Sequence, residues 1–319
     1  MKAALAADVG GTKMAIGAVD AEHRVRHSRV EPTRGLGADE LVARLTAGLI
    51  EARDAEPTVG AVGLGLPCAI DHDRGEAVSA VNLPISRVPI RDYLVEQLGL
   101  PVYLDNDANL AAIAEQRAGA ARGARHVVML TVGTGIGGGV IVDGRVYRGG
   151  SGSGAELGHM VIADGGPDCQ GTCPNRGCLE AMASGTALAR EARASAEANP
   201  DSRLGRLLAA GAGIDGPAVV QAAVAGDSLA LRLVELAGER LGAGLSSLAN
   251  IFAPEVFVVG GGVTGGAGEL LLQPARRELR SRALRPNGET PVLAAELGPA
   301  AGLVGAALLA MDDGAGASG

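Results

Sequence analysis

Short apolar segments alternate with longer amphipathic segments along most of the chain, a pattern that predicts the α/β class. Residues 3–8 ("AALAAD") and 13–20 ("KMAIGAVD") are typical of two strands joined by the glycine turn "VGGT". The same order of strand, glycine turn and strand recurs in residues 127–147, where "VGTGIGG" forms the turn. The recurrence predicts two related lobes, each of which opens with a glycine-turned hairpin.

The remaining segments divide between these two lobes. We expect residues 1–117 to form a smaller N-terminal lobe that is completed by a C-terminal helix at about 300–312, and residues 118–299 to form a larger lobe. Residues 313–319 are expected to be a disordered tail. The expected helices are 38–53, 90–98, a segment that begins near 107, 179–198, 228–253 and a segment after residues 260–271, and the expected strands are 59–67, 101–107, 255–259 and 290–297.

Composition narrows the class of function. The 319 residues are 47% apolar and 20% charged, as in a folded protein. A net charge of −8 argues against a general binder of nucleic acid or of anionic membranes, because such a protein needs a basic face. The chain has no tryptophan, three tyrosines and two phenylalanines, too few for stacking platforms, so we expect a ligand held by hydrogen bonds. The start "MKAALAAD" lacks a secretory apolar region and the longest apolar run is too short for a bilayer, which together favour the cytoplasm.

Two glycine motifs match the dinucleotide pattern G-x-G-x-x-G, but their context disfavours a hydride-transfer enzyme. "GTGIGG" at 133–138 continues as a strand, whereas the pattern requires a helix. "GGGVTG" at 260–265 follows a strand, but residues 280–285 ("RSRALR") supply no carboxylate for a ribose. The P-loop pattern is also absent from the sequence.

A different device for phosphate fits "DVGGTK". The amides of Gly10, Gly11 and Thr12 can form a concave row of donors for an anion, and Asp8 can hold magnesium directly or through water. The glycines at 133–138 would face this row from the other lobe. Ordinary tight hairpins also favour glycine, but two facing copies favour phosphate binding.

The segment "DNDAN", residues 105–109, lies where a strand ends and a helix begins. Asp105 or Asn106 could simply cap that helix, which is the commonest use of these residues. Acid and amide groups at the carboxyl end of a strand also form good ligand-binding clusters in open α/β sheets. On this second interpretation Asp107 is the candidate general base, since it can accept the proton of an attacking hydroxyl.

Three of the four cysteines gather in the loop 158–180, "GHMVIADGGPDCQGTCPNRGCLE". Their neighbours are glycine, proline and polar residues, so they are not core hydrophobes. With His159, the residues Cys169, Cys173 and Cys178 make a Cys₃His set typical of structural zinc, and a redox set is the main alternative. Cys68 lies far from this loop and is expected to be a packed thiol.

Taken together, "DVGGTK", "NDAN", "VGTGIGGG", "ELGH", the cysteine loop ending in "GCLE", and "VVGGG" resemble the ROK family of sugar kinases from about residue 3 to 311. The resemblance implies a two-lobed actin-like or Hsp70-like fold of duplicated ribonuclease H-like domains. It implies ATP-dependent phosphorylation of a hexose, with glucose favoured and glucose 6-phosphate as product. It also implies Mg²⁺, a structural Zn²⁺, a place in glycolysis and a homodimer or homotetramer.

The resemblance also assigns roles to residues. Asp107 would be the base, and His159 would bind zinc through one ring nitrogen and sugar through the other. The sugar would contact Asn106, Glu156, His159 and Glu180. Zinc would be held by His159, Cys169, Cys173 and Cys178. The nucleotide and its magnesium would contact Asp8, Gly10, Gly11, Thr12, Lys13, Gly133, Thr134, Gly135, Gly260, Gly261 and Gly262.

Three departures from the family pattern affect the sugar more than the reaction. The cysteines are spaced C-x₃-C-x₄-C, whereas the family usually has C-x-C-x₄-C, so Cys169 is the least certain ligand. Pro67–Cys68 replaces a frequent proline–glycine pair, and the family's tryptophan after "NLP" is missing. N-acetylmannosamine, N-acetylglucosamine, mannose and fructose remain alternative sugars, and polyphosphate an alternative donor. A non-catalytic sugar sensor is the alternative function.

Overall fold

The computed structural model describes residues 2–80 and 83–316. The chain forms two compact units, each with its own five-stranded sheet. Unit 1 comprises residues 1–122, 146–155 and 299–319, and unit 2 comprises residues 123–145 and 156–298. These units differ from the expected lobes mainly in the segment 146–155, which belongs to unit 1.

Unit 1 contains a mixed sheet of five strands. In spatial order they are β3 (Val25–Pro32), β2 (Lys13–Asp20), β1 (Ala3–Val9), β4 (Val59–Leu66) and β8 (Val102–Asn106). The strands β1, β4 and β8 are parallel, so their carboxyl ends meet at one edge of the sheet. The hairpin expected at the start of the chain is therefore present as β1 and β2.

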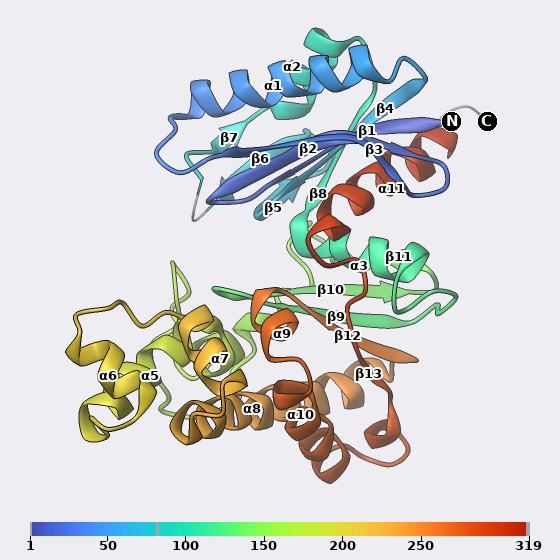
Figure 1. The fold of residues 1–319 in the computed structure, drawn as a ribbon. Coiled ribbons are helices and arrows are strands. Elements are labelled where there is room, and N and C mark those ends of the chain that lie inside the picture. Colours follow the sequence, from blue (N-terminus) through green and yellow to red (C-terminus); the bar gives the residue numbers. More distant parts are fainter. Residues whose placement is uncertain (1, 81–82, 317–319) are drawn as a thin grey trace. The chain divides into compact units, whose positions relative to one another are not determined.

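Alternate residues of β4 face two different helical layers of unit 1. Val62, Leu64 and Leu66 belong to a buried cluster that includes side chains of α1 (Ala38–Ala55) and α2 (Ile90–Leu98). Gly63 points to the other face, where it lies against Ala306 of α11 (Ala301–Gly316). Figure 1 shows α1 and α2 on one face of this sheet and α11, with α3 (Asp107–Ala118), on the other. α11 extends into the segment for which we expected disorder, and residues 317–319 lie outside the described residues.

The backbone of α11 approaches its neighbours too closely for larger side chains at the contacts. A Cβ at Gly63 would overlap the carbonyl oxygen of Ala306, and one at Gly305 would overlap the carbonyl oxygen of Leu110. A Cβ at Gly302 would overlap the Asp8 carboxylate. The small residues therefore bring the start of α11 directly beside one of the predicted site residues.

We expect Gly63→Ala to destabilise the protein by about 1–3 kcal/mol, because the added methyl group must push α11 away from β4. The change is measured as a lower midpoint of thermal unfolding. Gly213→Ala is the matched control, since a Cβ there meets open space. Equal stability of the two variants would show that α11 can move without cost.

A second, small sheet in unit 1 was not predicted. It consists of β5 (Cys68–Asp71), β6 (Glu76–Ala80) and β7 (Ser86–Val88), all antiparallel. Its strands are short, and the turn between the first two is the strongly polar "DHDRG", which hides the hairpin from a pattern analysis. The sheet places Cys68 next to the end of β8.

Unit 2 repeats the sheet order of unit 1. Its strands, in spatial order, are β11 (Arg145–Val146), β10 (Ile136–Val142), β9 (Val127–Val132), β12 (Val256–Gly260) and β13 (Val292–Ala294). The hairpin β9–β10 holds the same place as β1–β2, and β12 and β13 hold the places of β4 and β8. The prediction of two related lobes with equivalent hairpins is thus confirmed at the level of topology.

The helices of unit 2 are more broken than expected. Residues 179–198 form two helices, because Ser184 has an extended backbone and its hydroxyl accepts a hydrogen bond from the amide of Ala187. Gly268, with φ of +54°, similarly separates the helices that follow residue 260. The helices are α4 (Leu179–Ala183), α5 (Gly185–Ala198), α6 (Arg203–Ala209), α7 (Gly216–Val224), α8 (Ser228–Phe252), α9 (Gly262–Ala267) and α10 (Glu269–Arg282).

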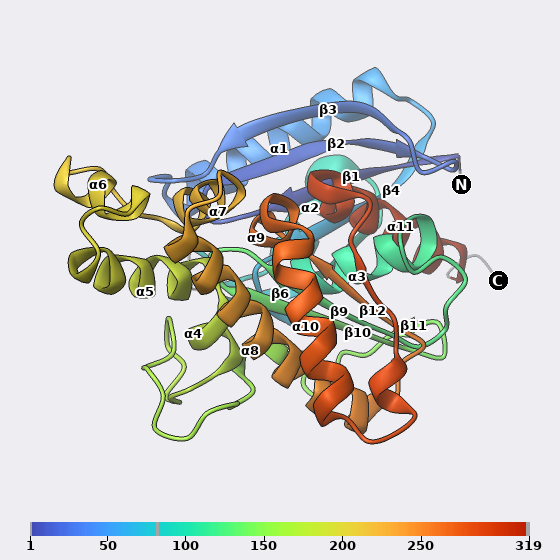
Figure 2. The same cartoon turned by 60° about the horizontal axis from the view of Figure 1, so that its bottom comes forward.

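Two of these helices pack along each other, as Figures 1 and 2 both show for α8 and α10. Gly238 and Gly242 of α8 lie against the backbone of α10 at Leu271 and Ala275.

Within residues 2–80 and 83–316, no helix combines the length and the apolar character that a bilayer span requires.

Candidate active site and metal centre

Asn106 and Asp107 lie at the junction of β8 and α3, at the carboxyl edge of the unit 1 sheet. Asn106 is the N-cap of α3: its Oδ1 accepts hydrogen bonds from the amides of Ala108 (2.9 Å) and Asn109 (3.4 Å). Its Nδ2 donates to the carbonyl of Cys68 at 3.4 Å. The side-chain oxygen of Asn106 therefore caps α3, as the capping interpretation expected, and its amide nitrogen faces β5.

Burial raises the pKa values of both Asp107 and Asp8, and the charge of Asp107 also acts on Asp8. Burial raises the pKa of Asp107, although the amide of Ala108, which donates to its Oδ1 at 2.8 Å, opposes the shift. Burial also raises the pKa of Asp8 to about 6, and the charge of Asp107 adds to this shift while Lys13 reduces it. A carboxylate with a raised pKa is a better proton acceptor near neutral pH than an ordinary aspartate.

Cys68 begins β5 beside these groups. Burial, together with the charge of Asp107, raises the pKa of its thiol to about 12. It belongs to the same buried cluster as the β4 side chains, as expected of a packed thiol. Because a thiol with this pKa stays protonated at neutral pH, Cys68 contributes shape rather than reactivity.

Asp105 is completely buried and is paired with an arginine that the sequence did not reveal. Its Oδ2 accepts a hydrogen bond from Arg148 Nε (2.8 Å) and forms an ion pair with Arg148 Nη2 (2.7 Å). Its Oδ1 accepts from the amide of Asn106 (2.8 Å) and from Asn109 Nδ2 (2.9 Å). This ion pair, with Gly152 packed against the carbonyl of Ile70, fastens the segment 146–155 to unit 1.

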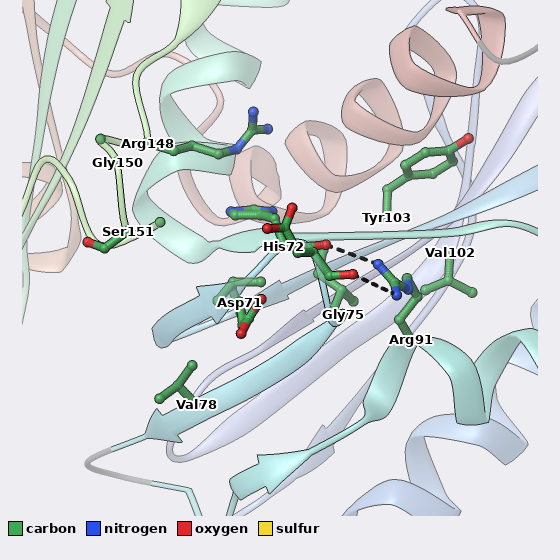
Figure 3. Close-up of a pocket in the computed structure, with 15 residues that line it drawn as sticks. Asp71, His72, Gly75, Val78, Arg91, Val102, Tyr103, Arg148, Gly150 and Ser151 are labelled. Atoms are coloured by element: carbon green, nitrogen blue, oxygen red, sulfur yellow. Dashed lines mark hydrogen bonds between the residues drawn. The ribbon is translucent and has the colours of Figure 1, made fainter.

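A cavity of about 700 Å³ in unit 1 is lined by this segment and by β5 and β8 (Figure 3). Arg148 and the ring of His72 border it, and Arg91 donates hydrogen bonds to the carbonyls of His72 (3.0 Å) and Asp73 (3.2 Å). Burial lowers the pKa of His72 against the opposing charge of Asp105. His72 therefore stays neutral at pH 7, and Arg148 remains the cation that neutralises Asp105.

Arg148→Met is expected to lower stability by about 3–5 kcal/mol, because Asp105 would remain buried without its cation. Arg148→Lys should lose less, since lysine keeps the charge but not the paired nitrogens. Urea unfolding measures both. The double variant Asp105→Asn/Arg148→Met should be more stable than Arg148→Met alone, and a double variant of equal or lower stability would contradict the role of the pair.

Each of the two predicted phosphate hairpins is closed by a hydrogen bond from the amide of its first glycine. In unit 1 the amide of Gly10 donates to the carbonyl of Lys13 at 2.9 Å, and in unit 2 the amide of Gly133 donates to the carbonyl of Gly135 at 2.9 Å. The amides of these first glycines therefore close the turns. The unit 1 tip is also held by the buried Thr33, whose hydroxyl donates to the carbonyl of Gly10 at 2.7 Å.

The third glycine motif, residues 260–262, links β12 to α9. Gly261 has φ of +89°, and a Cβ there would overlap the backbone of Val132, so only glycine fits. A Cβ at Gly262 meets open space at the start of α9. The motif thus has the order of strand, turn and helix that the dinucleotide pattern requires.

The structure brings all four predicted metal ligands together. His159 lies on the short turn Leu157–His159, Cys169 and Cys173 lie in the loop, and Cys178 caps α4. Their ligand atoms all lie within 4.8 Å of one another, with His159 Nδ1 3.4 Å from Cys169 Sγ and Cys173 Sγ 3.9 Å from Cys178 Sγ. Ligands around a tetrahedral zinc lie about 3.8 Å apart, so the set fits such an ion.

Without a cation, two of these thiols, Cys169 and Cys178, are difficult to ionise. Burial, together with Cys178 and Cys173 nearby, raises the pKa of Cys169 to about 12, and burial also raises the pKa of Cys178. The two extra residues before Cys173 are taken up by a turn in which the amide of Cys169 donates to the carbonyl of Asn175 at 3.0 Å. The altered spacing therefore does not remove Cys169 from the cluster.

Glu156 and Glu180 flank the metal cluster along the chain. Glu156 is exposed and precedes the turn that carries His159, whose amide donates to the Glu156 carbonyl at 3.1 Å. Glu180 Oε2 accepts a hydrogen bond from the amide of Ile136 at 2.8 Å, and its Oε1 lies 3.9 Å from Cys169 Sγ. The contact between Glu180 and the unit 2 hairpin had no signal in the sequence.

Comparisons with known proteins agree with this architecture. The chain matches the model of the ROK family over residues 4–313. It is 37% identical to a glucokinase of Streptomyces coelicolor over 311 residues, which cover 96% of each chain. A crystal structure of a ROK family glucokinase from Streptomyces griseus in complex with glucose and AMPPNP is 38% identical, with a TM-score of 0.85 over 97% of this chain and 99% of that one. A ROK hexokinase from Thermus thermophilus is 40% identical, with a TM-score of 0.80 over 98% of this chain and 99% of that one. The protein belongs to the ROK family.

Proposed function

We propose that the protein transfers the terminal phosphoryl group of ATP to a hydroxyl of a hexose, with glucose as the favoured acceptor and glucose 6-phosphate as the product. The observation that carries the proposal is the position of Asp107, a half-buried carboxylate with a raised pKa at the carboxyl end of β8. The likeness to a glucokinase solved with glucose and AMPPNP supports both the acceptor and the donor.

On the acceptor side, Asp107 takes the proton of the attacking hydroxyl as the new bond to phosphorus forms and the bond from that phosphorus to ADP breaks, so that ADP leaves. The Nδ2 of Asn106 faces the same edge and donates to a sugar oxygen. Glu156, Glu180 and the Nε2 of His159 bind the remaining hydroxyls. The Nδ1 of His159 faces the cysteines, so a metal there would fix the orientation of the ring.

On the donor side, the tips of the two hairpins bind the phosphates. Gly11 and Thr12 in unit 1, and Thr134 and Gly135 in unit 2, supply backbone amides. Lys13 adds a positive charge at the start of β2, and Gly10 and Gly133 close the turns. Glycines 260–262 lie against the adenosine, where a Cβ at Gly262 would meet open space.

Two metal ions complete the proposal. Asp8 is the residue that would hold Mg²⁺, because burial and the charge of Asp107 raise its pKa more than the charge of Lys13 lowers it, so that a bound cation would stabilise its ionised form. Such an ion would neutralise charge on the transferring phosphoryl group. The cluster of His159, Cys169, Cys173 and Cys178 would hold a structural Zn²⁺.

The test is an assay of the purified protein with MgATP and a panel of sugars: glucose, mannose, fructose, N-acetylglucosamine and N-acetylmannosamine. We expect ADP and a sugar 6-phosphate to form in equal amounts, fastest with glucose. A parallel series with polyphosphate tests the donor. Binding of glucose without turnover would identify a sugar sensor, and turnover of another sugar only would replace glucose as the acceptor.

A further inference from the structure

The residues that follow Cys178, the last member of the metal cluster, contact the turn of the predicted phosphate hairpin of unit 2. We call residues 178–186 the link segment; it begins at the ligand Cys178 and ends in the first turn of α5. The hairpin tip is residues 133–136, between β9 and β10. Both belong to unit 2, so their contacts lie within one compact body.

Three residues of the link segment hold the tip. Glu180 Oε2 accepts from the amide of Ile136 at 2.8 Å. The amide of Gly185 donates to the carbonyl of Gly133 at 2.8 Å. Thr186 donates twice to the carbonyl of Thr134, from its hydroxyl at 2.9 Å and from its amide at 3.3 Å.

The metal cluster and its loop contact the link segment at other points besides Cys178. Gln170, from the loop between two ligands, donates from Nε2 to the buried hydroxyl of Ser184 at 3.0 Å. Glu180 Oε1 lies 3.9 Å from Cys169 Sγ. On the other side of the cluster, Gly158 packs so closely on the carbonyl of Ile136 that a Cβ would overlap it. A change in the cluster therefore reaches the tip by several short paths.

We propose that the metal loop positions the unit 2 phosphate hairpin through the link segment, so that metal occupancy sets the affinity for the phosphate part of the donor. This role is additional to the orientation of His159 toward the sugar, and its nucleotide part rests on the proposed function. Thr186 and Glu180 act here as positioning residues for the tip. The unit 1 hairpin has its own support in Thr33 and serves as an internal control.

The coupling is measured first without any nucleotide. Hydrogen–deuterium exchange of the peptides that contain residues 133–136 and 10–13 is compared in zinc-loaded and metal-free protein. We expect exchange at 133–136 to accelerate about tenfold on removal of zinc, because the bond from Ile136 to Glu180 loosens, and exchange at 10–13 to stay unchanged. Unchanged exchange at 133–136 would overturn the proposal.

The second measurement uses Thr186→Val, with Thr186→Ser as the matched variant that keeps the hydroxyl. Thr186 is exposed, so neither change disturbs the core. Thr186→Val should accelerate exchange at 133–136 in zinc-loaded protein, whereas Thr186→Ser should exchange there at the rate of the natural protein. In metal-free protein the effect of Thr186→Val should be smaller, because both changes act on the same contacts. If zinc removal and Thr186→Val accelerate exchange independently, so that their two factors multiply, they do not act through the same contacts, and the proposal is contradicted.

Nucleotide binding gives the functional readout. The affinity for a fluorescent ADP analogue should fall about tenfold in Thr186→Val and in metal-free protein, a loss of about 1.4 kcal/mol. Adenosine, which lacks phosphates, should compete with unchanged affinity. Equal losses for adenosine would mean general damage and would overturn the proposal. If exchange at 133–136 depends on zinc but the protein binds no ADP, the positioning role stands and the proposed kinase function is overturned.

Discussion

Asp107→Asn is expected to lower kcat at least about 100-fold, because an amide cannot accept the proton of the attacking hydroxyl. KM for the sugar should change much less, since asparagine keeps the size and polarity of the side chain. Steady-state kinetics measure the effect, and Asp92→Asn, an exposed change on α2, is the matched control with full activity. Retention of more than about a tenth of kcat would refute the role of Asp107 as base.

The same variant should alter the pH profile. Because burial raises the pKa of Asp107, the acid limb of kcat/KM in the natural protein should have its midpoint above 3.8, the ordinary value for aspartate. Activity is lost as the pH falls through this midpoint, since the protonated carboxyl is no longer a base. The residual activity of Asp107→Asn should lack this limb.

Asp8→Asn is expected to change activity and stability in opposite directions. Turnover should fall at least about 100-fold, because the carboxylate that would hold Mg²⁺ beside the transferring phosphoryl group is lost. In magnesium-free buffer at pH 8 the variant should nevertheless unfold at a temperature a few degrees higher than the natural protein. Asp8 has a pKa of about 6 in the folded chain and an ordinary value of 3.8, so its ionisation costs folding free energy.

The sign of this stability change is tested by pH. The folded state is free of the penalty below 3.8 and carries all of it above about 6, so the advantage of Asp8→Asn should shrink as the pH is lowered from 8 to 5. Thermal unfolding at the two pH values measures the difference. A variant that is less stable at pH 8, or equally stabilised at both, would contradict the assigned pKa.

The parts of the fold that were predictable are those set by local pattern. Each hairpin combines two apolar strands with a glycine turn inside some twenty residues, and the recurrence of this motif correctly predicted two sheets of related topology. The long helices α1 and α8 followed from their apolar periodicity. The small sheet β5–β7 was missed because its strands are short and one turn is strongly polar.

The parts of the site that were not predictable depend on partners distant in the chain. Nothing near Asp105 indicates Arg148, and nothing near Glu180 indicates that its carboxylate accepts the amide of Ile136. Ser184 was read as an interior helix residue, although its hydroxyl ends one helix and begins the next. The cluster of His159, Cys169, Cys173 and Cys178 was predicted correctly because thiols and imidazole in a polar loop have few other uses.

Asn106 shows a different limit. Its residue type and position satisfy both a helix cap and a ligand contact, and the structure uses one end of the side chain for the cap. A sequence cannot distinguish these roles, because both require a short polar group at the same strand end.

The place of α11 in the chain has a consequence for biosynthesis. This helix covers one face of the first sheet, yet it follows all of unit 2 along the polypeptide. On the ribosome, the strands of unit 1 emerge early with Gly63 and its neighbours unprotected, and unit 2 is translated before their covering helix exists. The first half of the protein to be made is therefore the last to be completed.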